Sequence, residues 1–138
     1  MPIIEGTKKI GSAGGGRKAA VATYSFATHG GAVGDIALTS DTIPSGAVIL
    51  DAYIKVSTAL TSGGAATVAI KVESAADINA ADAISGAPWS TTGTKRGDFT
   101  ATTAPVTTTA ARAIVATVAT AALTAGAFTV VVEYIEFA

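Results

Sequence analysis

The chain has 138 residues, of which 49% are hydrophobic and only 14% charged, and its formal net charge is −1. This length suits one domain with a substantial core, and near-neutrality argues against binding nucleic acids or membranes through bulk charge. We expect neither as a partner. The absence of cysteine excludes disulfides, thiolate catalysis and cysteine-ligated metals.

The N-terminal region raises the first functional question in the segment GSAGGGRKAAVATYSFA, residues 11–27. Its glycines partly match phosphate-binding loops, but Lys18 stands where a Walker A loop needs a hydroxyl, and nucleotide motifs need a helix afterwards. The following residues alternate as a strand instead. One face of that strand carries Ala20, Ala22, Tyr24 and Phe26. We therefore interpret residues 1–18 as a flexible N-terminal arm and residues 19–138 as the folded domain.

Further strands are indicated by period-two alternation between turn signals. We predict them at residues 35–40, 48–58, 66–73, 110–120 and 127–137, with turns at 43–46 and 62–64. In the clearest strand, one face carries Val48, Leu50, Ala52, Ile54 and Val56. Such a pattern is typical of antiparallel strands with one solvated face.

One segment departs from the strand pattern. In residues 74–85, SAADINAADAIS, Ser74 is a plausible N-cap, Asp77 lies in the first turn, and Ile78 would share a helical face with Ala81. We predict a short helix there. Residues 86–109 are weakly patterned and long enough to be functional, with one or two irregular strands expected within them.

Two similar segments, ALTSG at residues 59–63 and ALTAG at 122–126, each precede a predicted strand. They are interpreted as two hairpins with the same turn chemistry, the alternative being a pseudo-symmetric sandwich of related halves. The sequence as a whole predicts a mainly β fold: an antiparallel β-sandwich, jelly-roll-like, with one short helix and an extended N-terminal arm.

Catalytic patterns are weak. The single histidine, His29, lies beside two glycines and is interpreted as a loop residue. The carboxylate pairs Asp77/Asp82 and Glu133/Glu136 have spacings that place their members on different faces of a helix and a strand. Asp35, Asp41 and Asp51 lack the spacing of a calcium-binding loop. We therefore expect a non-enzymatic protein without metal or cofactor.

Basic residues form two clusters, whose ordinary explanation is solubility and whose sharper one is docking onto an acidic surface. The first cluster lies in the arm, and the second, Lys95 and Arg96, lies in the weakly patterned segment with Trp89 and Phe99. Stacking on nucleic acid would need aromatic residues among the basic ones. The arm has none, and the second cluster offers only Trp89 and Phe99, which more often fill the end of a core. We therefore do not expect nucleic acid as the partner.

The string TIPSGAVILDAYIKVSTALTSGGAATVAIKVESAADINAADAIS, followed by WSTTG and LTAGAFTVVVEY, resembles small virion proteins of tailed bacteriophages, in particular capsid decoration (cement) proteins. The resemblance covers roughly residues 24–134. It implies a β-rich protein, often a homotrimer, made in the host cytoplasm and bound to the major capsid protein on the capsid exterior, which it strengthens. Some such proteins reach across capsid subunits with an N-terminal arm.

On that resemblance, the arm contributes apolar and basic contacts to the shell. The docking residues we expect in it are Pro2, Ile3, Ile4, Lys8, Lys9, Ile10, Arg17 and Lys18. The second expected partner-contact segment holds Trp89, Lys95, Arg96 and Phe99. Two alternatives stay open: a self-assembling tail-tube or pilin-like subunit, and a small carbohydrate-binding module with Trp89, Tyr53 and Phe99 as its platform.

Overall fold

The computed structural model describes residues 16–98 and 105–136. Within these residues it contains eight strands and one short helix. In chain order they are β1 (Lys18–Ser25), α1 (Phe26–His29), β2 (Gly34–Ile43), β3 (Ala47–Ser62), β4 (Thr67–Lys71), β5 (Asn79–Ala83), β6 (Gly93–Arg96), β7 (Arg112–Ala119) and β8 (Leu123–Glu136). The mainly β prediction is confirmed.

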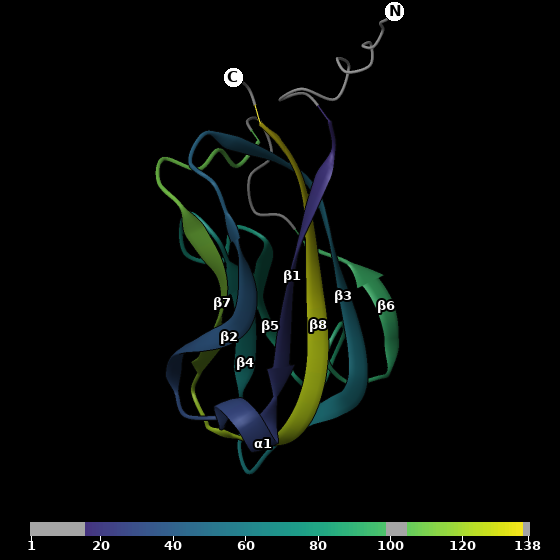
Figure 1. The fold of residues 1–138 in the computed structure, drawn as a ribbon. Coiled ribbons are helices and arrows are strands. Elements are labelled where there is room, and N and C mark those ends of the chain that lie inside the picture. Colours follow the sequence, from purple (N-terminus) through teal and green to yellow (C-terminus); the bar gives the residue numbers. More distant parts are fainter. Residues whose placement is uncertain (1–15, 99–104, 137–138) are drawn as a thin grey trace, which may run out of the picture.

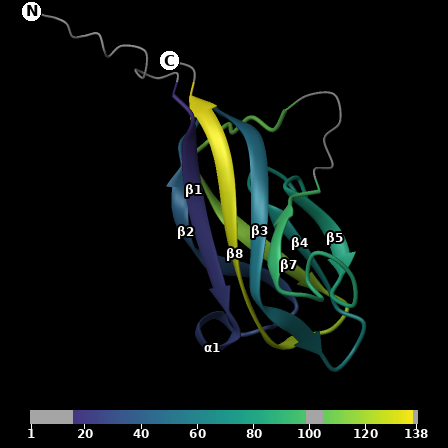
Figure 2. The same cartoon turned by 90° about the vertical axis from the view of Figure 1, so that its right-hand side faces the viewer.

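All eight strands belong to one antiparallel sheet with the order β5-β4-β7-β2-β1-β8-β3-β6. The sheet curls around its own concave face into a half-barrel, and β1 and β8 lie side by side at its centre (Figure 1). The predicted two-sheet, jelly-roll-like sandwich is not confirmed, because the strands form one continuous sheet. Neighbouring strands run in opposite directions, so both ends of the described chain lie far from α1 (Figure 2).

The core fills the concave side of the curled sheet. The buried residues of β1 are Ala20, Ala22 and Tyr24, as the alternation predicts, and they face alternate residues of β8. Phe26 was expected on the same face but is 38% exposed. The strand ends at Ser25 and the chain turns into α1, so the period of two no longer applies at Phe26.

The predicted helix over residues 74–85 is wrong. The chain makes a turn after β4 and then forms β5. The carboxylate of Asp77 explains the turn, because it accepts the backbone N–H groups of Val72, Glu73 and Ser74 at 2.8–2.9 Å. A side chain that binds the preceding backbone in this way competes with helix formation.

The face assigned to β3 is correct for Ala52, Ile54 and Val56, which are buried, but wrong for Leu50, which is 39% exposed. The β3–β8 register pairs Ile49 with Tyr134 and Asp51 with Glu133, so Leu50 is an extra residue in β3. This β-bulge reverses the alternation before it, which puts Ile49 rather than Leu50 in the core.

The segments ALTSG (residues 59–63) and ALTAG (residues 122–126) lie next to each other and are not the turns of separate hairpins. Thr61 pairs with Ala125 and Ser62 with Leu123, and the hydroxyl oxygens of Thr61 and Thr124 are 2.8 Å apart. In this crossing, Gly126 has φ +138°, and a Cβ there would lie 2.1 Å from Cδ2 of Leu60. Glycine is therefore required where β8 passes β3.

The two edge strands of the curled sheet, β5 and β6, approach each other at a seam. The backbone carbonyl of Asp98, just after β6, accepts the N–H of Ala80 in β5 at 3.1 Å, and the N–H of Asp98 donates to Oδ1 of Asn79 at 2.9 Å. Gly97 donates its N–H to the carbonyl of Ala52 at 2.8 Å. The backbone of Asp98 therefore bridges the seam between β5 and β6 through two hydrogen bonds.

Candidate interaction surfaces

The base of the predicted arm is part of the folded domain. Lys18 opens β1 opposite Tyr134, and its Nζ lies 2.7 Å from Oε1 of Glu136. This hydrogen bond raises the pKa of Lys18 above its usual value. Arg17 pairs with Glu133 at 2.9 Å. Both cations therefore contact acidic groups of their own chain at the end of the sheet.

The other expected docking residues lie outside the part of the chain that the structure describes. In the arm these are Pro2, Ile3, Ile4, Lys8, Lys9 and Ile10. Phe99 and most of the glycine-rich segment lie outside it as well. The element that begins shortly after Gly16 is the strand β1 and not a helix. The structural context that a nucleotide-binding loop needs is therefore missing after these glycines.

Trp89 lies in the core and not at the surface. It is fully buried, and its indole N–H donates to the carbonyl of Val68 in β4 at 3.2 Å. Its ring lies 4.9 Å from that of Phe128, which stacks on Tyr24 at 5.0 Å. Trp89 therefore has no exposed surface to offer a partner. It joins the two halves of the curled sheet.

The proposed sugar platform is not assembled in the described residues. Tyr53 points outward from β3, where the guanidinium of Arg96 lies 5.7 Å from its ring centroid. Trp89 is on the other side of the sheet, in the core. Stacking on a sugar ring needs an exposed aromatic face, and these two rings do not share a surface.

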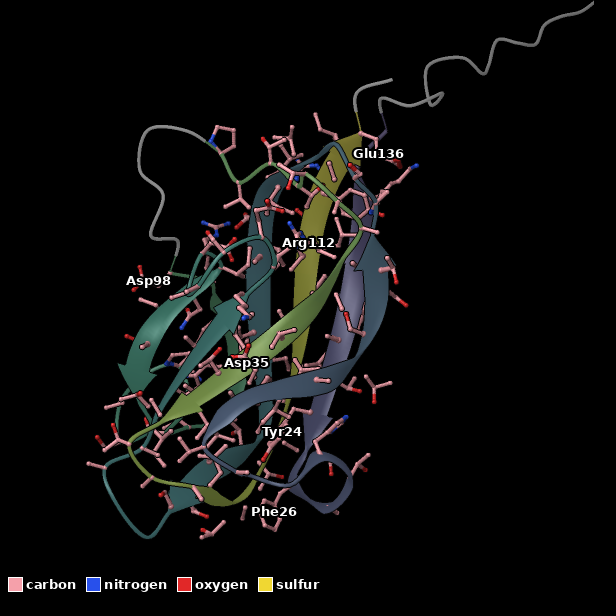
Figure 3. All side chains as sticks on the ribbon, turned by 90° about the vertical axis from the view of Figure 1, so that its left-hand side faces the viewer. Tyr24, Phe26, Asp35, Asp98, Arg112 and Glu136 are labelled. Carbon is pink, nitrogen blue, oxygen red and sulfur yellow. The ribbon has the colours of Figure 1, made fainter. Side chains whose placement is uncertain are left out.

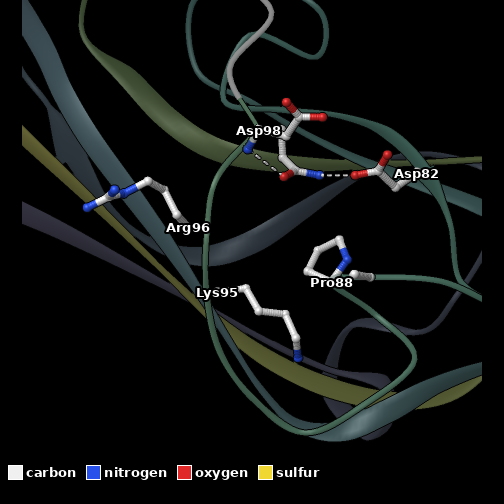
Figure 4. Close-up of a pocket in the computed structure, with 7 residues that line it drawn as sticks. Asp82, Pro88, Lys95, Arg96 and Asp98 are labelled. Carbon is white, nitrogen blue, oxygen red and sulfur yellow. Dashed lines mark hydrogen bonds between the residues drawn. The ribbon is translucent and has the colours of Figure 1, made fainter.

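A pocket of about 280 Å³ lies at the β5–β6 seam (Figure 4). Its lining residues are Asn79, Asp82, Ala87, Pro88, Lys95, Arg96 and Asp98. Asn79 is buried and satisfied, since its amide donates to Asp82 at 3.1 Å and its oxygen accepts from Asp98. Lys95 Nζ donates to the carbonyl of Thr91 at 2.9 Å. Arg96 points away from Asp82 and Pro88 (Figure 4).

The polar groups of this pocket therefore serve mainly to hold the seam together. In the part of the chain that the structure describes, no three histidine or acidic side chains are grouped so as to hold a metal ion. The sequence places Lys95 and Arg96 in one partner-contact segment, and the structure puts them on a short edge strand with side chains that diverge.

His29 has structural partners at the end of β1. Its Nε2 lies 2.9 Å from Oγ1 of Thr39, and its Nδ1 lies 3.1 Å from the backbone nitrogen of Ser25. The ring stacks on Tyr24 with centroids 5.7 Å apart. It belongs to the short helix α1 and not to an open loop, and these contacts tie that helix to β1 and β2.

The outer side of β1, β8 and β3, which we call the outer wall, carries a row of apolar side chains across its centre. Strand register defines its central row, because Val21 pairs with Val131 and Val131 pairs with Tyr53. Val21 and Leu50 are each 39% exposed. The predictions from sequence did not include this wall, although the run Val130–Val131–Val132 signals a strand with apolar residues on both faces.

Four connections between strands lie at the end of the molecule that carries α1, and none of them contains a charged side chain. Residues 26–33, 63–66, 84–92 and 120–122 contain no Asp, Glu, Lys or Arg. Phe26 and Val33 are exposed there, whereas Arg112 and Glu136 lie at the opposite end (Figure 3). These connections therefore carry no charge of their own, although Nζ of Lys95 in β6 reaches the carbonyl of Thr91 in one of them. No described helix is long and apolar enough to cross a bilayer.

Comparisons with known proteins connect this architecture to phage capsids. No family model matches the chain, and neither does any curated protein sequence. A chain of the cyanophage Pam1 capsid asymmetric unit is similar, with a TM-score of 0.64, 19% identity, and coverage of 99% of this chain and 94% of that one. The acid-stable capsid of Helicobacter pylori bacteriophage KHP30 contains another, with a TM-score of 0.58, 16% identity and 86% coverage of both.

At these identities the likeness shows a shared fold. It extends over nearly the whole chain and not just a few strands. The resemblance to phage virion proteins that the sequence shows is thereby confirmed at the level of the fold.

Proposed function

We propose that this protein is a non-enzymatic structural component of a phage virion that decorates the outside of the capsid and stabilises it. The observation that carries the proposal is the fold shared with a chain of a phage capsid over 99% of this chain. The sparse charge and the exposed apolar outer wall support a surface that other protein subunits cover.

Docking on the shell is assigned to the N-terminal residues before β1. Pro2, Ile3 and Ile4 offer apolar contacts, and Lys8 and Lys9 offer charge to acidic groups of the major capsid protein. Arg17 and Lys18 are paired with Glu133 and Glu136, so their part in docking is to anchor the segment at the sheet. Because a shell repeats its sites many times, weak contacts by each copy are sufficient.

The test is co-sedimentation of the purified chain with shells made from the phage genome that encodes it, with this gene deleted. The full chain is expected to bind and to raise the temperature at which the shells break. Deletion of residues 1–16 is expected to abolish binding while the circular dichroism spectrum and cooperative unfolding are kept, since β1 starts at Lys18.

Two further variants sharpen this experiment. Reversal of charge at Lys8 and Lys9 is expected to weaken binding, whereas the control Lys71→Gln, a basic residue paired with Asp35 in the sheet, is expected to bind normally. Normal binding by the truncated chain contradicts arm-mediated docking. A full chain that ignores shells and forms open polymers favours a tail-tube subunit instead.

Self-association, with a homotrimer as the expected assembly, is the remaining part of the proposal. Its support is that exposed apolar side chains occur in two places that another subunit would cover: Val21 and Leu50 on β1 and β3, and Phe26 and Val33 at the α1 end.

A further inference from the structure

The central row of the outer wall ends in opposite charges. At one end, Asp41 of β2 lies beside Val21 and its Oδ2 accepts the N–H of that residue at 3.0 Å. At the other end, Tyr53 pairs with Arg96 of β6. Across the sheet the row therefore runs from an acidic group, through valines and a tyrosine, to a basic group.

The rest of the wall is electrically balanced. Its basic side chains are Arg17, Lys55 and Arg96, and its acidic ones are Asp41, Asp51 and Glu133, which sum to zero. Two of the acidic groups already have a basic neighbour: Glu133 pairs with Arg17 and Asp51 with Arg96.

This balance discriminates between possible occupants of the wall. A strongly charged partner gains little from a surface with zero net charge, whereas a second copy meets it without net repulsion and buries apolar area on both sides. The two ends of the row also complement each other, since Asp41 is exposed and the Arg96 side chain is 68% exposed despite its contact with Asp51.

We propose that a second copy of this chain covers the outer wall, with Asp41 of one copy facing Arg96 of the next and Val21, Val131 and Tyr53 packed between them. The inference rests on the self-association part of the proposed function and names its surface. Because the row has a negative and a positive end, the contact can repeat head to tail around a closed ring, as the expected trimer requires.

The experiment is a charge swap followed by sedimentation equilibrium of the full chain over a range of concentrations. Asp41→Lys and Arg96→Glu each bring like charges together, so each is expected to weaken association about tenfold or more. The double variant restores opposite signs and is expected to recover to within about threefold of the original chain. Thermal unfolding of every variant confirms that the domain is intact.

A second pair of variants tests the apolar part of the row. Val21→Asp is expected to give monomers, because a carboxylate in the packed centre stays without a partner. Val33→Asp is the matched control, because it introduces the same group at a position that is 58% exposed at the α1 end. It is expected to leave association unchanged.

Three results overturn the inference. The first is that the chain is a monomer at every concentration. The second is that the double variant associates no more tightly than either single variant, and the third is that Val33→Asp, and not Val21→Asp, abolishes association. If Val21→Asp keeps its mass and loses shell binding, the wall contacts the shell and not another copy, which overturns it too. Failure of the full chain to bind shells, with association intact, contradicts decoration but not this interface.

Discussion

The surroundings of Trp89 in the structure decide between two roles that its place in the sequence leaves open. In the sequence it stands in a weakly patterned segment near two cations, which suits a partner-contact residue as well as a core residue. The structure buries it completely and satisfies its indole N–H with the carbonyl of Val68. The backbone carbonyl of Trp89 also accepts the N–H of Leu60 in β3 at 3.2 Å. A residue that joins β3 and β4 in this way has a packing role.

The contacts of Glu73 make the stability of the fold depend on pH. Its carboxylate accepts Nε of Arg112 at 2.8 Å and Nη2 at 3.2 Å, along with the N–H and hydroxyl of Thr109. Hydrogen bonds from Arg112, and then from Thr109, lower the pKa of Glu73 from its ordinary 4.5 to about 2. Folding thus favours the ionised form.

A depressed carboxyl pKa contributes stability that is present above the unfolded-state pKa and lost as pH falls through the folded-state pKa. We therefore expect the advantage of the natural chain over Glu73→Gln to be full above about pH 5 and to shrink between pH 4.5 and 2. Urea unfolding of both proteins across about pH 2–7 measures it. A stability difference that does not change with pH would show that Glu73 does not titrate in this window.

At the scale of elements, errors in the predicted structure occur where a side chain or an extra residue overrides local periodicity. Residues 74–85 have helical spacing, but Asp77 holds the backbone in a turn and β5 then pairs with β4. In β3 the pattern is right after the bulge at Leu50 and reversed before it. Both effects depend on partners outside the segment, so periodicity alone does not reveal them.

The turn after β4 depends on Asp77, which is 4% exposed. Asp77→Ala leaves three backbone N–H groups without their acceptor, so we expect it to lower the free energy of unfolding by about 1–3 kcal/mol. Ser74→Ala, at an exposed position in the same turn, keeps the backbone N–H that Asp77 accepts. It is the control and is expected to change little. Urea unfolding checks both, and equal stability of the two variants contradicts the role assigned to Asp77.

At the scale of the whole molecule, strand order joins the two ends of the chain. β1 lies between β2 and β8, so a strand close to the N-terminus is central to the sheet. Its register with β8 runs from Lys18–Tyr134 to Ser25–Ala127. The domain cannot close until residues more than a hundred positions apart have paired, which is typical of slow-folding β-topologies.

This arrangement predicts a sharp boundary for truncation. Deletion of residues 1–16 is expected to keep cooperative unfolding, whereas deletion of residues 1–25 removes β1 and leaves β2 and β8 without their shared neighbour. We expect that second chain to have no cooperative transition by circular dichroism or calorimetry. A folded product from the longer deletion contradicts the central place of β1.

The sequence by itself determined the class of the fold, most strand positions and the absence of an obvious catalytic pattern, because alternation and turn residues are local properties of the chain. It also carried the resemblance to phage virion proteins that the shared fold confirms. Only the tertiary structure decided that the strands form one curled sheet, that Trp89 is a core residue and that Asp41 and Arg96 end a common row. These features arise from pairing between distant segments, and local periodicity contains no information on which strands become neighbours.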